Sequence, residues 1–165
     1  MRNVNIISCR TVKGAKSDIV ADALKNPTSC AVIYPSPGAV ALSYDACKHM
    51  KNLIFLDGTW QHAKEMFNSS PELQTLPCFK LSLPLDYRGA FVIRKAVGVS
   101  ESADFSPVCT AEAVALALDE LTHSTERQTA VRRVLKAYSD QQLGFTVDVK
   151  HRTDKKDYIP DLYKR

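Results

Sequence analysis

Residues 53–60 read Leu53-Ile54-Phe55-Leu56-Asp57-Gly58-Thr59-Trp60, and they decide the predicted fold. The first four form an uninterrupted apolar run, which is typical of a short strand buried on both faces. The Asp-Gly pair that follows indicates a turn where this strand ends. Threonine is favoured at helix starts, so we expect a helix that continues through residue 67.

A second apolar run comes earlier, at residues 30–34, and Pro35-Ser36-Pro37-Gly38 breaks it sharply. Residues 110–121 are rich in alanine and leucine and predict a strong helix. Buried strands that alternate with helices are typical of an α/β domain with a mostly parallel sheet flanked by helices. Ligands of such sheets bind beyond the C-terminal ends of the strands, where both turns are expected.

The other segments carry weaker patterns, and we expect one domain over residues 1–165. A long helix is predicted over residues 125–143, with Thr125 and Gln128 spaced as a capping box. The remaining expectations are a weak strand over 4–7, a helix over 19–24, a short helix over 41–50, extended segments over 76–83 and 90–93, and a strand with a basic tail over 144–165.

The composition is that of a globular protein of 165 residues with a net charge of +4. This charge permits a polyanionic partner without demanding one. The five cysteines lie far apart without a C-x-x-C pair, so we expect neither a disulfide framework nor a zinc site. We find no targeting signal and no membrane-spanning stretch, which predicts a soluble cytoplasmic protein, or a nuclear one in a eukaryote.

The turn after residue 56 contains the residue types that a ligand site needs. A carboxylate at Asp57 would lie at the ligand-binding edge of the sheet, and Gly58 would let backbone approach a ligand. Thr59 can cap the next helix, and Trp60 offers a flat face to a nucleobase or an adenine. A structural alternative is an Asp-Gly turn, a helix cap and a half-buried tryptophan. Spacing alone leaves both open.

Four motifs in order resemble the DTW-domain family, which is named for a D-x-T-W signature. That signature corresponds here to Leu56-Asp57-Gly58-Thr59-Trp60-Gln61-His62-Ala63-Lys64. The family's Y-P-S turn resembles Tyr34-Pro35-Ser36, and its S-T-x-E-A helix start resembles Cys109-Thr110-Ala111-Glu112-Ala113, with cysteine replacing serine. Between them, in family order, come Ser70-Pro71, Leu73, Leu76-Pro77 and Ile93-Arg94-Lys95. The resemblance covers roughly residues 19–121.

The resemblance implies a SPOUT-like fold with a trefoil knot around the cofactor. It also implies transfer of the 3-amino-3-carboxypropyl group of S-adenosylmethionine to N3 of a tRNA uridine, with release of 5′-methylthioadenosine. S-adenosylmethionine would be a co-substrate, tRNA the partner, and no metal is needed. The catalytic residues would be Asp57, Thr59 and Trp60. The cofactor-binding residues would be Tyr34, Pro35, Ser36, Leu56, Gly58, Leu76, Ile93, Arg94, Thr110, Glu112 and Ala113.

The chemistry suggests a role for each charged group. Uridine N3–H is a weak acid, and Asp57 could take or polarise its proton. Burial beside Trp60 would strengthen this carboxylate as a base, and we expect an adenosine pocket next to it. The N–H groups at Thr110 could hold the carboxylate of the transferred group. Glu112 would face its ammonium or cap its own helix.

Several alternatives remain open. Arg94 and Lys95 could neutralise phosphate or the cofactor carboxylate, or lie at a solvated strand end. Arg132, Arg133 and Lys136 could contact RNA phosphates, although a solvated surface explains them equally well. Rival functions are a SPOUT-like RNA methyltransferase, an rRNA aminocarboxypropyltransferase and a non-catalytic RNA-binding module. DTW proteins often carry a cysteine-rich segment ahead of this region. The present sequence has none, which predicts a short family member or a missing natural N-terminus. The oligomeric state is not predicted.

Overall fold

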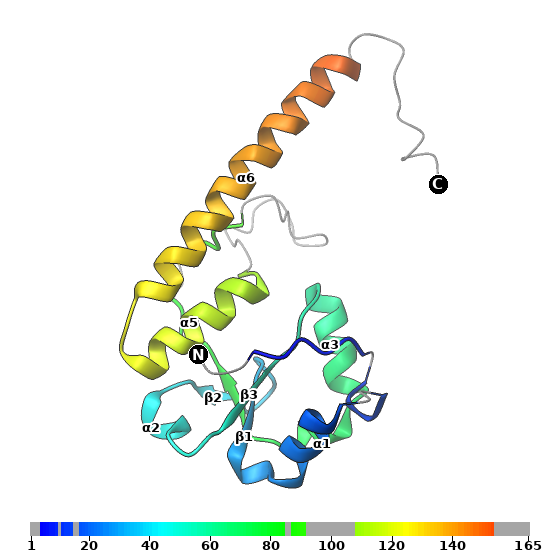
Figure 1. Cartoon of the computed structure of the whole chain (residues 1–165), viewed down its shortest axis with the longest axis vertical. Helices are drawn as coiled ribbons and strands as arrows, with labels where there is room; N and C mark the ends of the chain where they lie inside the picture. The colour runs from blue at the N-terminus through cyan, green and yellow to red at the C-terminus, as the bar shows by residue number, and fades with distance from the viewer. Residues whose placement is uncertain (1–3, 10, 15–16, 85–86, 92–107, 154–165) are drawn as a thin grey trace.

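The computed structural model describes residues 4–9, 11–14, 17–84, 87–91 and 108–153 (Figure 1). Four described strands form one sheet: β1 (Cys30–Ile33), β2 (Val40–Ala41), β3 (Asn52–Phe55) and β4 (Cys78–Lys80). Their order is β2-β4-β1-β3, and every pairing is parallel. The predicted parallel α/β architecture is therefore confirmed.

Helices cover both faces of this sheet. The α-helices are α1 (Asp18–Lys25), α2 (Tyr44–Cys47), α3 (Trp60–Asn68), α4 (Pro71–Gln74), α5 (Thr110–Thr122) and α6 (Glu126–Thr153), and two 3₁₀ turns are η1 (Val12–Gly14) and η2 (Pro27–Ser29). In Figure 1, α5 and α6 lie above the sheet, and α6 projects far beyond it. At 1.5 Å per residue, its 28 residues span about 42 Å. No helix in the described ranges is long and apolar enough to cross a membrane.

The alternation of side chains along β1 explains the two core clusters. Cys30 and Val32 point to a cluster with residues of α1, α3 and α4, whereas Ala31 points to a cluster with residues of α2, β4 and α5. All three side chains are fully buried. A strand covered on both faces needs an uninterrupted apolar run, which is what the sequence has at residues 30–34.

Some predicted elements are wrong near the sheet. Residues 4–7 form no strand, and Ile6 is 96% exposed. The helix expected over 41–50 is only α2, because β2 pairs with β4 and Ser43 then caps the helix by accepting the N–H of Ala46 at 3.3 Å. β3 lies at the sheet edge and is only partly buried, because one neighbouring strand covers it.

The C-terminal predictions also need correction. Helix α6 continues to Thr153, so the strand expected from residue 144 is wrong within the described residues. Extending an existing helix costs less than nucleating a new element, which favours this continuation. Residues 154–165, like residues 92 and 93 of the extended segment predicted over 90–93, lie outside the described ranges. The trefoil knot stays a prediction, since residues 92–107 lie outside them too.

Candidate functional site

Two predicted motifs lie side by side at the C-terminal edge of the sheet. Tyr34 directly follows β1 and Leu56 directly follows β3, and these strands pair in register from Cys30–Asn52 to Ile33–Phe55. The Y-P-S and D-G-T-W turns therefore leave the sheet at neighbouring positions. The end of β4 lies beside them, because the N–H of Tyr34 donates to the carbonyl of Phe79 at 2.9 Å.

A hydrogen bond within the turn and a ring contact with α3 fix the turn after β1. The carbonyl of Ser36 accepts the N–H of Ala39 at 3.0 Å, and Gly38 has a φ of 84°. With Pro37 in the second position, this is the pattern of a type II turn, which requires positive φ at its third residue. The Tyr34 ring stacks on Phe67 of α3 with centroids 4.6 Å apart, and burial raises the pKa of Tyr34. The motif is thus held against α3.

The D-G-T-W turn starts α3 as predicted. Thr59 is the N-cap residue, and its Oγ1 accepts the N–H of His62 at 3.2 Å. Gly58 has a φ of 146°, which L side chains rarely adopt. A Cβ at Gly58 would also come within 3.1 Å of the Cβ of His62. Glycine and threonine are therefore both needed for the shape of this turn.

The predicted burial of Asp57 beside Trp60 is wrong. Asp57 is exposed, and Trp60 is 53% exposed. The physical reason is the position of β3 at the sheet edge, where the described residues leave the following turn open to solvent. A carboxylate and an indole on an open edge are accessible to a large substrate.

The sequence predicts an anion site at the start of α5, and this site stays a prediction. Cys109 occupies the N-cap position, and its thiol makes no capping hydrogen bond. This agrees with the weak acceptor strength of a thiol. Thr110 and Ala113 are partly buried in the first turn. A helix of 13 residues whose N-cap side chain makes no hydrogen bond has the kind of terminus that suits an anion.

Glu112 lies one turn into α5 and is fully buried. Its carboxylate accepts the hydroxyl of Tyr87 at 2.8 Å and the N–H of Ala90 at 2.9 Å, and it pairs with the Arg132 guanidinium. The predicted cap to its own helix is therefore wrong. Arg132 also donates to the Tyr87 hydroxyl at 2.6 Å and to the carbonyl of Arg88 at 3.1 Å. Its Nη1 is thus engaged within the protein, while the side chain stays 37% exposed, so the phosphate contact considered above stays a prediction.

Tyr87 is the centre of this network. Burial, and next the hydrogen bond to Glu112, raise the pKa of Tyr87 to about 12. The Arg132 guanidinium also lies 5.1 Å from the centre of its ring. At neutral pH the hydroxyl therefore keeps its proton and can donate it to Glu112 while it accepts from Arg132. Neither its spacing nor a motif distinguishes Tyr87 in the sequence.

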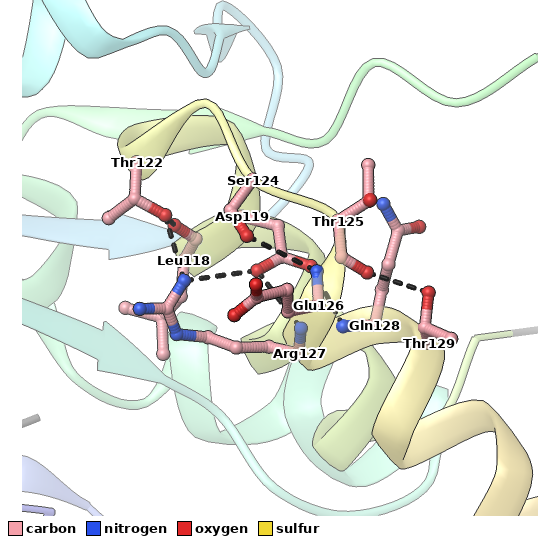
Figure 2. Close-up of polar contacts among 9 residues, drawn as sticks. All are labelled: Leu118, Asp119, Thr122, Ser124, Thr125, Glu126, Arg127, Gln128 and Thr129. Atoms are coloured by element: carbon pink, nitrogen blue, oxygen red, sulfur yellow. Dashed lines mark hydrogen bonds and ion pairs between the residues drawn. The ribbon is translucent and has the colours of Figure 1, made fainter.

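A second buried carboxylate, Asp119, joins α5 to α6 (Figure 2). It accepts the N–H groups of Gln128 at 2.8 Å and Arg127 at 3.3 Å, and the Arg127 guanidinium at 3.1 Å. Burial pushes the pKa of Asp119 upward, but these hydrogen bonds and the guanidinium outweigh it, so the net shift is downward. The capping box predicted for Thr125 is wrong, because the ionised Asp119 takes the N–H of Gln128.

One hollow of about 220 Å³ lies between the end of β4 and the α5–α6 turn. Leu42, Leu81, Leu83 and Leu116 line it, together with polar residues of the turn. The D-G-T-W residues do not line it, so the adenosine pocket expected beside Asp57 stays a prediction. Within the described ranges, no three His, Cys, Asp or Glu side chains gather as metal ligands would.

The other predicted site residues divide into two groups. Leu76 is buried in the core, and Tyr34 and Leu56 pack against the same hydrophobic cluster, so this cluster supports both turns. Ile93 and Arg94 lie outside the described residues. The structure thus brings together the residues of the Y-P-S and D-G-T-W turns.

The family model of the DTW domain matches residues 5–143, which is most of the chain. The chain belongs to the DTW domain family. This family is linked to tRNA-modifying enzymes. No match was found among curated proteins or among solved structures. In this DTW domain, the signature residues Asp57, Thr59 and Trp60 form the exposed turn that begins α3.

Proposed function

We propose that this DTW protein transfers the 3-amino-3-carboxypropyl group of S-adenosylmethionine to N3 of a uridine in tRNA. One observation carries the proposal: the D-x-T-W turn lies beside the Y-P-S turn at the C-terminal edge of a parallel sheet. Open parallel sheets bind their ligands at this edge. The family's link to tRNA modification supports RNA as the acceptor.

The proposed reaction is a single displacement at carbon. A bond forms between uridine N3 and the carbon of the 3-amino-3-carboxypropyl group, and the bond from that carbon to the sulfonium breaks. The sulfur keeps the electron pair and leaves as neutral 5′-methylthioadenosine. The N3 proton passes to the carboxylate of Asp57. The sulfonium already activates the carbon, so the protein acts mainly by orienting the reacting atoms and by taking the proton.

The exposure of the signature residues suits a macromolecular acceptor. Trp60 presents more than half of its surface at the start of α3, next to the turn that contains Asp57. An indole face can stack on a base, and such stacking contributes about 1–3 kcal/mol per base. We propose that Trp60 holds the uridine ring while Asp57 meets N3–H. Thr59 keeps both in place by capping α3.

The start of α5 is the proposed binding site for the carboxylate of the co-substrate. The Cys109 thiol leaves the first turn of this helix without a side-chain cap, so its N–H groups suit an anion. Tyr34, Pro35, Ser36, Leu56 and Gly58 would form the neighbouring wall from the adjacent strand ends. By family resemblance, Ile93, Arg94, Thr110 and Ala113 complete the proposed set.

The test is mass spectrometry of tRNA nucleosides and small-molecule products after incubation with S-adenosylmethionine. We expect 3-(3-amino-3-carboxypropyl)uridine in equal amount to methylthioadenosine. Asp57→Asn should lower turnover by about 100-fold or more, the usual contribution of a general base, without weakening co-substrate binding. Asp140→Asn, which alters an exposed carboxylate on α6, is the matched control.

Four results would contradict the proposal in different ways. Full turnover by Asp57→Asn would remove Asp57 from the mechanism. S-adenosylhomocysteine as the by-product would show methyl transfer, and the modified nucleoside in rRNA would show a different acceptor. A protein that binds tRNA but not S-adenosylmethionine would be an RNA-binding module.

A further inference from the structure

Two buried carboxylates, Glu112 and Asp119, stabilise the helical hairpin formed by α5 and α6, but they connect different parts of the chain. Among the described residues, the Asp119 carboxylate accepts hydrogen bonds only from residues 127 and 128 at the start of α6. Glu112 bonds to Arg132 of α6 and also to Tyr87 and Ala90, which follow β4 in the sequence. The contacts of Asp119 with Arg127 and Gln128 therefore stabilise only this hairpin. The contacts of Glu112 also join the hairpin to residues 87–90.

The hydrogen-bond partners of Glu112 lie well beyond its own helix. Each carboxylate oxygen accepts from a different part of residues 87–90, one from a hydroxyl and one from a buried backbone N–H. Arg132 donates to the same segment through the Arg88 carbonyl. A fully buried carboxylate is costly unless it is paired and hydrogen-bonded. These contacts hold residues 87–90 against both helices.

The location of Glu112 connects this network with the proposed site. It lies in the first turn of α5, where the co-substrate carboxylate is proposed to bind. Any loss of the Glu112 contacts would loosen the first turn of α5 against residues 87–90 and α6. The more distant Asp119 lies in the third turn of α5, and its contacts fix only the hairpin connection.

We propose that Glu112, with Tyr87 and Arg132, is a positioning group that fixes the start of α5 for co-substrate binding. This inference rests on the proposed function. Glu112 acts here through the protein's own groups, because Tyr87, Ala90 and Arg132 take both of its carboxylate oxygens. This role differs from the contact with the co-substrate ammonium that the chemistry suggested for Glu112 in the sequence.

The experiment compares matched substitutions of the two carboxylates in the full chain. Glu112→Gln should weaken S-adenosylmethionine binding, measured by calorimetry, at least tenfold, and should accelerate amide exchange at Ala90, measured by NMR, at least tenfold. Asp119→Asn makes the same chemical change in the same hairpin. It should lower the melting temperature to a similar degree but leave both readouts within twofold of the wild type.

A conservative variant keeps the test decisive if Glu112→Gln does not fold. Tyr87→Phe removes one hydroxyl from the network and keeps the ring, so it should shift both readouts in the same direction by about threefold. The proposal is overturned if binding by the Glu112 or Tyr87 variant equals that of the wild type, or if Asp119→Asn weakens binding equally.

Failure of the proposed function would look different. A wild-type protein that binds no S-adenosylmethionine refutes that function and, with it, any role of Glu112 in co-substrate binding. The exchange rate at Ala90 then decides the structural part by itself: unchanged exchange in Glu112→Gln would show that Glu112 does not hold residues 87–90.

Discussion

Replacement of Gly58 by alanine should lower the free energy of unfolding strongly, although it adds only one methyl group. Its φ of 146° lies where L residues are strained, and such strain costs about 1–3 kcal/mol. The new Cβ would also lie 3.1 Å from the Cβ of His62. Because a Cβ is fixed by its backbone, α3 itself would have to shift. We therefore expect a loss of about 2–3 kcal/mol, in the upper part of that range.

Gly38 offers a matched control for this prediction. It also has positive φ, at 84°, but a Cβ built there meets nothing within 4 Å. Gly38→Ala should thus pay only for the left-handed conformation, about 1 kcal/mol. The difference between the two variants isolates the contact with α3.

Urea denaturation, followed by circular dichroism, measures both free energies of unfolding. An unchanged m-value would show that the comparison concerns stability rather than a different unfolded or native state. If Gly58→Ala costs no more than Gly38→Ala, the close contact with His62 does not constrain the turn, and the reasoning is refuted.

Three further predictions concern the Thr59 cap, the Asp119 carboxylate and the exposed Trp60. Thr59→Ala should destabilise the protein by about 1 kcal/mol in the same denaturation assay, whereas Thr59→Ser should keep most of that stability; equal losses would show that the Oγ1 cap contributes nothing. The pKa of Asp119 is lowered in the folded protein, so its contribution to stability is present above the unfolded value of about 4 and is lost as pH falls below it. The stability advantage of the wild type over Asp119→Asn should therefore shrink between pH 7 and pH 3, and a constant difference would exclude the charge as its source. Trp60→Ala should lower the free energy of unfolding by less than the about 3–5 kcal/mol that truncation of a fully buried aromatic costs, because 53% of the residue is exposed, but it should weaken tRNA binding in a filter assay; unchanged binding would exclude base stacking.

The sheet and its two turns could be predicted from the sequence because their causes are local. An uninterrupted apolar run, a Pro-Gly turn and a threonine cap each act over a few residues. The exposure of Asp57 could not be predicted in this way. It depends on the strand order, which leaves β3 with one neighbour, and strand order is set by contacts between distant segments.

The buried carboxylates show the same limit at the level of single residues. The capping-box rule considers residues three apart, such as Thr125 and Gln128, but Asp119 reaches the N–H of Gln128 from the preceding helix. Glu112 has partners 20 and more residues away in both directions. It was predicted as a site residue because it belongs to a motif, and the structure gives both of its oxygens to the protein's own groups. A motif residue can therefore mark the support of a site rather than its chemistry, and only the identity of its hydrogen-bond partners separates the two.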